Sequence, residues 1–265
     1  MLESCQTGVI VLEDGTAKVG KGTVGSAIEA SYRAIEPNRN CQSISAGNAY
    51  RAMTALVIAD VSKSTFSRED AEGILERLGD PDYVEMLQND ENIPGKLAQV
   101  AQMEGAQQLG DIVTSQQVLA SYMEGGITVF DARNPFNTLN RNNLIGDNAD
   151  QVRARSLVPL LVTCPVADAA RRMRSIGQDF YPHMYSINAR NQEDRGRVVN
   201  AYSNPPVSEL DWANWAIRVR HGNLDLIDGV PEHFQFNNGG SSSIANLQTF
   251  GGEVADLVVE MQRAA

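Results

Sequence analysis

The sequence predicts a mixed fold, α/β or α+β, with a helical centre between short strands. Short apolar runs typical of strands occur at residues 9–12, 127–131 and 157–164. Apolar residues at helical spacing dominate residues 67–124. Residues 177–210 follow neither pattern, so we expect long irregular loops in the C-terminal half. The 265 residues are 42% hydrophobic and 21% charged, which favours a single domain with one substantial core.

The N-terminal quarter predicts a hairpin, a helix and a strand, in that order. Residues 9–12 and 16–19 flank the pair Asp14-Gly15, and Asp-Gly supplies the positive φ angles of a tight hairpin turn. A helix is expected from about residue 23 to residue 35. The apolar run 55–59 is short enough to predict a buried strand.

The helical centre opens with a typical capped start. Ser67 precedes two acidic residues, which predicts a helix through residue 78. A second helix is expected from Pro81. A third begins at Pro94 and keeps one apolar face through Val113.

The C-terminal half alternates ordered elements with polar loops. The asparagine-rich segment 134–150 predicts a long loop, and such loops are usually functional or interaction segments. A strand over 157–164 and a basic helix over 167–176 follow. A Gly/Ser-rich connector precedes residues 244–265, which predicts a terminal amphipathic helix on a flexible attachment.

Charge is distributed unevenly along the chain. The net charge is −11, yet residues 151–220 hold ten basic side chains and six acidic ones. All ten are arginines, and we call them the arginine belt. Arginine, tyrosine and tryptophan are the residue types that anchor protein interfaces. The interaction residues that we single out are Arg171, Arg172, Arg174, Arg195, Arg197, Trp212 and Trp215.

These features favour a structural protein rather than an enzyme. We expect a subunit that self-assembles into a large homo-oligomer, such as a viral or phage coat protein, with copies of itself as partners. The arginine belt would meet the acidic surface of a neighbouring copy. Two alternatives stay open: the belt pairs with acidic residues of its own chain, or it binds nucleic acid through phosphate pairing and stacking.

A glycine-rich turn supports a rival hypothesis, a nucleotide-binding enzyme. Gly20, Gly22 and Gly25 form a GxGxxG pattern that leads into the helix expected from residue 23. The dinucleotide fingerprint also needs a strand directly before it and an acidic residue about 20 positions later. Asn48-Ala49-Tyr50 stands at that later position, so a glycine-rich turn after the hairpin is the favoured interpretation. The sequence contains no GxxxxGK[ST] phosphate loop either.

No linear pattern predicts a catalytic residue, a metal site or a bound cofactor. Three histidines and three cysteines are scattered outside the usual ligand spacings. The N-terminus shows no signal peptide, and no apolar run is long enough to span a membrane. We therefore expect a cytoplasmic or virion protein with no membrane partner.

Overall fold

The computed structural model describes residues 8–15, 19–132, 135, 138–139, 142–146, 148, 150–164, 166–175, 189, 234–239 and 244–264. It shows an α/β fold, which confirms the first of the two predicted classes. None of the helices in these ranges is long and apolar enough to cross a membrane.

A five-stranded parallel sheet forms the centre of the molecule, in the order β2-β3-β1-β4-β5. The strands are β1 (Val9–Gly15), β2 (Cys41–Ser45), β3 (Ile127–Asp131), β4 (Leu157–Thr163) and β5 (Phe234–Asn237). β1 lies in the middle, with β3 on one side and β4 on the other. All seven residues of β1 are buried, as expected for a parallel strand covered on both faces.

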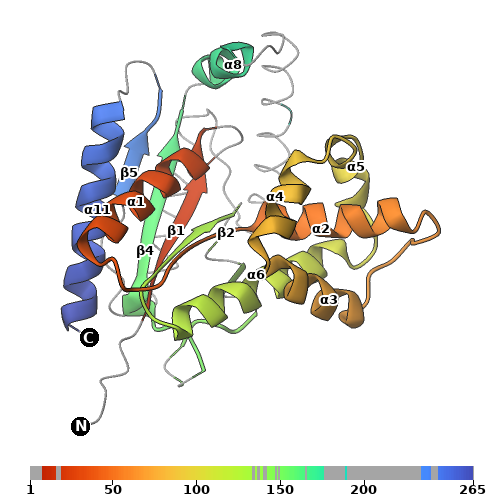
Figure 1. Ribbon diagram of the computed structural model, residues 1–265, viewed down its shortest axis with the longest axis horizontal. Helices are drawn as coiled ribbons and strands as arrows, with labels where there is room; N and C mark the ends of the chain where they lie inside the picture. The colour runs from red at the N-terminus through yellow and green to blue at the C-terminus, as the bar shows by residue number, and fades with distance from the viewer. Residues whose placement is uncertain are drawn as a thin grey trace, which may run out of the picture.

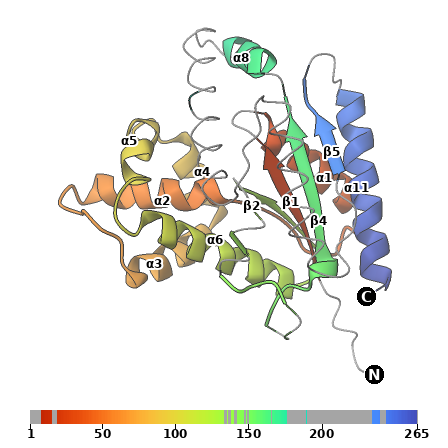
Figure 2. The ribbon, with the colours of Figure 1, turned by 180° about the vertical axis from the view of Figure 1, so that it is seen from behind.

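Helices cover both faces of the sheet (Figures 1 and 2). On one face lie α1 (Lys21–Ile35) and α11 (Ile244–Ala264), which pack against each other. On the other face lies α6 (Ala106–Met123). Side chains of β1 alternate between these layers, with Val11 facing α1 and Leu12 facing α6.

A helical unit stands beside the β2 edge of the sheet and has a hydrophobic core of its own (Figure 1). It consists of α2 (Ala46–Ala59), α3 (Arg68–Leu78), α4 (Pro81–Asn89), α5 (Ile93–Val100) and the first half of α6. The remaining described elements are the short 3-10 helix η1 (Ala154–Ser156) and α8 (Val166–Ser175), which follows β4.

The predicted hairpin is wrong. Both edges of β1 are occupied by parallel partners, β3 and β4, so residues 16–19 have no edge of β1 to pair with. The Asp14-Gly15 pair ends a long strand instead of turning it. Residues 16–18 lie outside the described ranges, and Val19 is a bend just before α1.

The predicted strand at 55–59 is also wrong, because these residues form the last turns of α2. Ser45 caps this helix by accepting a hydrogen bond from the backbone of Gly47. Buried Ala49, Met53 and Val57 recur at helical spacing. A short apolar run alone cannot distinguish a buried strand from the buried side of a helix. The helix predicted from Pro94 to 113 is likewise two helices, separated at Gly105 in a left-handed conformation.

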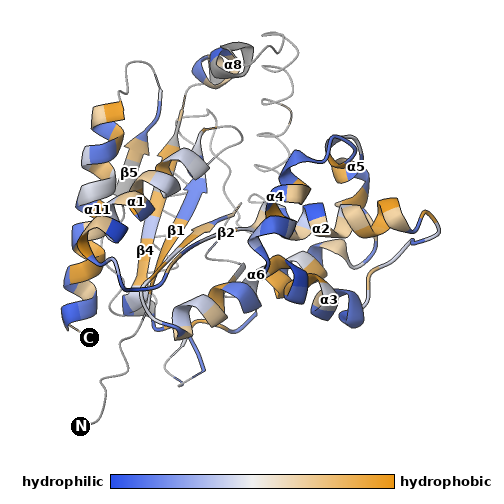
Figure 3. Ribbon diagram, in the orientation of Figure 1, coloured by the Kyte–Doolittle hydropathy of each residue, from blue (hydrophilic) through white to orange (hydrophobic). Residues whose placement is uncertain are grey.

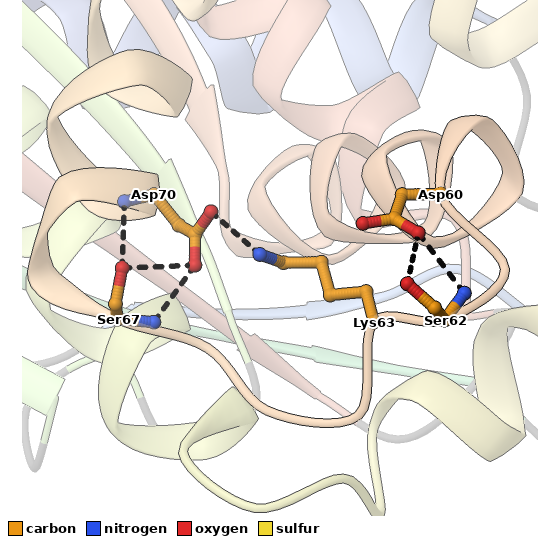
Figure 4. A network of polar contacts seen from close by, with 5 residues as sticks. All are labelled: Asp60, Ser62, Lys63, Ser67 and Asp70. Atoms are coloured by element: carbon orange, nitrogen blue, oxygen red, sulfur yellow. Dashed lines mark hydrogen bonds and ion pairs between the residues drawn. The ribbon is translucent and has the colours of Figure 1, made fainter.

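The loop between α2 and α3 is held by two aspartates (Figure 4). Asp60 accepts hydrogen bonds from the hydroxyl and backbone of Ser62. Asp70 accepts from Lys63 at 2.8 Å and from Ser67, which caps α3 in a reciprocal capping box. Burial alone would raise the pKa of Asp70, but the bonds from Lys63 and Ser67 outweigh it and hold this pKa below the ordinary value.

We predict that Asp70→Ala lowers the free energy of unfolding by about 1 kcal/mol, because it removes the Asp70 half of the capping box and the Lys63 contact while the Ser67 cap remains. Since the folded pKa of Asp70 is depressed, this contribution is fully present above the unfolded pKa of about 3.9 and is lost as pH falls through the folded value. Urea unfolding at pH 7 and at acidic pH measures it. Glu69→Ala, which removes an exposed acidic group from the same turn, is the control; an equal loss there would contradict the assignment.

Candidate phosphate-binding site

Two glycines define the ends of the loop that joins β1 to α1. A Cβ atom on Gly15 would lie 2.2 Å from the carbonyl oxygen of Val162 on β4, so only glycine fits there. Gly20 has a left-handed backbone with φ 87°, which glycine adopts without strain. The chain therefore leaves the sheet at Gly15 and enters α1 just after Gly20.

The N-terminus of α1 lies directly after Gly20. The carbonyl of Gly20 accepts from Thr23 and Val24, which starts the helix. Gly20 provides no side-chain cap, and the first turn contains no acidic residue. A helix N-terminus with free N–H groups and a positive dipole end binds anions, phosphate above all.

Lys21, the first residue of α1, bridges the loop to the sheet. Its ammonium donates a hydrogen bond to the carbonyl of Gly15 at 3.3 Å. It also forms an ion pair with Asp131 at 3.4 Å. Asp131 is the last residue of β3, and its side chain is 26% exposed against 14% for Lys21. The ammonium of Lys21 thus lies between the carbonyl of Gly15 at the end of β1 and the carboxylate of Asp131 at the end of β3.

Glu13 lies on β1, two residues before Gly15, on the α1 side of the sheet. It pairs in register with Asp131, and it is 1% exposed. Among the described residues, the backbone N–H of Gly25 approaches its carboxyl without forming a hydrogen bond of good geometry, and no side chain hydrogen-bonds to either oxygen. Burial, reinforced by the negative charge of Asp131, raises the pKa of Glu13 to about 9. The side chain is therefore protonated and neutral at pH 7. Figure 3 shows β1 changing from hydrophobic to hydrophilic toward this end.

The carboxyl ends of β1 and β3 also meet at a topological switch point. The chain leaves β1 over one face of the sheet through α1. It leaves β3 over the other face, where Leu139 and Val152 pack into the cluster that contains α6 residues. Open α/β sheets bind ligands in the crevice outside adjacent strands whose connections diverge in this way. Lys21, at the start of α1, and Asp131, at the end of β3, meet at this end of the sheet.

The sequence between β1 and α1 resembles a phosphate-binding loop that the strict pattern does not match. Gly15-Thr16-Ala17-Lys18-Val19-Gly20-Lys21 fits GxxxxGK between a strand and a helix, and only the following Ser/Thr is replaced, by Gly22. A Cβ atom at Gly22 would meet nothing within 4 Å, so packing does not require glycine there. Thr23 follows directly. A search that allowed one mismatch would have found the loop.

A second cation lies on α2, which begins where β2 ends. Ser45, the cap of α2, pairs in register with Asp131, so this helix starts beside the same sheet edge. Arg51 donates to the side chain of Asn48 at 3.1 Å and lies against Gly47 in the first turn. In the part of the chain that the structure describes, no carboxylate forms an ion pair with Arg51.

The three glycines of the rival hypothesis have different positions. Gly20 and Gly22 belong to the loop and the first turn of α1. Gly25 packs against the sheet, where a Cβ atom would lie 3.1 Å from a methyl group of Val129 and 3.2 Å from Glu13. The dinucleotide fingerprint still lacks its acidic residue, because residues 48–50 lie in α2. The phosphate-loop interpretation fits the glycines better.

Half of the arginine belt, five of its ten arginines, lies outside the described ranges. Arg171 pairs with Asp168 one turn earlier on α8, within its own chain. Arg172 and Arg174 belong to the same helix. Arg195, Arg197, Trp212 and Trp215 lie outside the described residues, so the predicted interaction surface stays a prediction. Among the described residues, no group of three or more His, Cys, Asp or Glu side chains could hold a metal ion.

Comparisons with known proteins add little. No family model matches the chain, and no curated protein matches it. A solved structure described as TT1252 from Thermus thermophilus shares 14% sequence identity. The match covers 82% of this chain and 98% of that one, with a TM-score of 0.34. A similarity this low carries no argument about function.

We predict that Glu13→Gln changes how stability depends on pH. The folded protein holds a proton that the unfolded chain releases above pH 4.5, so wild-type stability falls as pH rises from 4.5 to about 9. The variant lacks this slope. Its free energy of unfolding, relative to that of wild type, should therefore increase by at most about 1.4 kcal/mol per pH unit over this range. Urea unfolding at pH 5, 6, 7 and 8 measures the difference. Glu85→Gln, on the surface of α4, should keep the wild-type slope; parallel curves for Glu13→Gln and wild type would show that Glu13 is ionised in the fold.

Proposed function

We propose that the protein binds a nucleoside triphosphate through the Gly15–Gly22 loop and transfers its terminal phosphoryl group to a small anionic acceptor. The Lys21 contacts support this proposal best: a lysine at the start of α1, folded back onto the first glycine of the loop and paired with the last residue of the neighbouring strand. A strand, a glycine-rich loop ending in lysine, and a helix form the nucleotide-binding motif of P-loop proteins.

The ion pair gives Lys21 a resting position from which a phosphate can draw it. Its contacts with Asp131 and with the carbonyl of Gly15 are long, at 3.4 Å and 3.3 Å. A polyphosphate seated on the N–H groups of α1 would offer stronger, charge-assisted hydrogen bonds. Lys21 would then neutralise charge on the transferring group, which is the main electrostatic demand of phosphoryl transfer.

The helical unit would supply the acceptor site. Arg51 lies on α2, which begins next to Asp131, and its guanidinium suits bidentate recognition of a phosphate or carboxylate. The side chain of Asn48 already orients it. An acceptor bound there would lie between the helical unit and the crevice at the end of β3. This arrangement favours transfer to an anionic small molecule over simple hydrolysis.

We predict that Lys21→Met weakens triphosphate binding roughly ten- to a hundredfold, because it removes one charged contact to the phosphates. Titration calorimetry with ATP and GTP, each with and without Mg²⁺, measures the affinity. Lys96→Met removes the same charge from α5, in the helical unit, and should bind as wild type does. If wild type and both variants bind equally, or none binds, the proposed function is wrong.

We predict that Arg51→Ala raises the KM of the acceptor roughly tenfold or more and leaves triphosphate affinity unchanged. The assay follows phosphoryl transfer from ATP or GTP to a panel of small phosphate- and carboxylate-bearing acceptors. Arg68→Ala, an exposed arginine on α3, is the control. If the protein hydrolyses the triphosphate and none of the acceptors increases the rate, the protein is a hydrolase and the proposed transfer step is wrong.

Self-assembly and nucleic-acid binding remain separate hypotheses about the arginine belt. The Arg171–Asp168 pair shows one of its members neutralised within its own chain. The residues from 190 to 233 that carry most of the others lie outside the described structure. Neither hypothesis conflicts with a phosphate site on the opposite, N-terminal part of the sequence.

A further inference from the structure

We propose that Glu13 is a positioning residue of the phosphate site, which donates a hydrogen bond to Asp131 when a bound triphosphate draws Lys21 away. This inference rests on the proposed function and adds a role for a side chain that the phosphate loop does not itself require. It concerns one buried group, its neighbours and the order in which their contacts change.

The placement of Glu13 carries the argument. Glu13 and Asp131 are register partners on adjacent strands, so their Cα atoms are about 4.8 Å apart. Val11 and Val129 share one core cluster, and alternation puts residues 13 and 131 on that same face of the sheet. The two carboxyl groups are therefore neighbours under the first turns of α1.

Glu13 is also an unused donor. It is 1% exposed, and the one polar group that approaches its carboxyl among the described residues is the backbone N–H of Gly25, which can only donate, so no group there accepts the proton of Glu13. Leaving a buried polar group unsatisfied is costly, so such a group in a folded protein calls for an explanation. A contact that forms only with ligand bound is such an explanation, because Asp131 is engaged by Lys21 here.

The charges around Glu13 favour its neutral form. Asp131 on β3 and Glu29 on α1 are the negative groups that face it, and Lys21 is the positive one. On β4 its register partner is Leu160, which is apolar. Burial and these charges together raise the pKa of Glu13 to about 9, so a proton is available for Asp131 at neutral pH.

The exchange avoids an uncompensated charge. When Lys21 moves to the phosphates, Asp131 would face a polyanion without a partner. The hydroxyl of protonated Glu13 replaces the lost contact, and the pair of carboxyl groups then shares one proton and one negative charge. Ionised Glu13 could not do this, and it would add a second negative charge beside the phosphates.

The test compares Glu13→Leu, which cannot donate, with Glu13→Gln, whose amide can. Titration calorimetry with ATP at pH 7.5 should give wild-type affinity for Glu13→Gln within about twofold, and roughly tenfold weaker binding for Glu13→Leu, the loss of one hydrogen bond to a charged group. Urea unfolding should show Glu13→Leu at least as stable as wild type, which separates positioning from folding.

A pH series gives a second readout that a merely structural role would not change. From pH 7 to 10, the wild-type dissociation constant should rise above pH 9, by at most about tenfold per pH unit, relative to that of Glu13→Gln. Both proteins carry Lys21, so the difference between their profiles isolates Glu13. This comparison decides the matter if Glu13→Leu does not fold.

The outcomes distinguish this inference from the proposed function. The role of Glu13 alone would be overturned by two results together. Triphosphate binding would be weakened in Lys21→Met but unchanged in Glu13→Leu, and the pH profiles of Glu13→Gln and wild type would be parallel. Failure of wild type to bind any triphosphate would overturn both. Weak binding by Glu13→Leu, with rescue by Glu13→Gln, would support the exchange.

Discussion

The pairing of β1 with two parallel neighbours is the constraint on which the rest of the structure depends. Because β3 and β4 occupy both edges, β1 must end where the chain can turn away from the sheet, and the carbonyl of Val162 allows only glycine at that point. The chain then enters α1 through Gly20. The loop, the helix N-terminus and Lys21 all take their positions from this exit.

Electrostatics at the strand ends is as restrictive as packing. The side chain of Glu13 lies on the α1 face of the sheet, the face that Val9 and Val11 also occupy. Burying a carboxyl group there costs free energy that an apolar side chain would not. The fold accommodates it as a neutral acid, beside Asp131, which forms an ion pair with Lys21. A stable fold does not need this arrangement, which is why the cluster points toward a ligand rather than toward stability.

Local patterns in the sequence predicted much of the fold. Capping at Ser67 and proline at the first turn of α4 marked helix starts that the structure confirms. The apolar runs at 127–131 and 157–164 are strands, as expected. Errors arose where one short pattern suits two structures, as at 55–59, and where the meaning of Asp14-Gly15 depended on which strands lie beside β1. Propensity is local, but strand pairing is not.

The sequence by itself determined a mixed fold of helices and strands and most helix boundaries, because these depend on neighbouring residues along the chain; it left α/β and α+β open and did not identify Gly15 or Lys21. Only the tertiary structure decided that Lys21, Asp131 and Glu13 share one site. Asp131 is 110 residues from Lys21 in sequence. The two side chains meet because β3 lies between β2 and β1 in the sheet. Distance along the chain carries no information about which strands become neighbours in a parallel sheet, and so no linear motif could reveal that cluster.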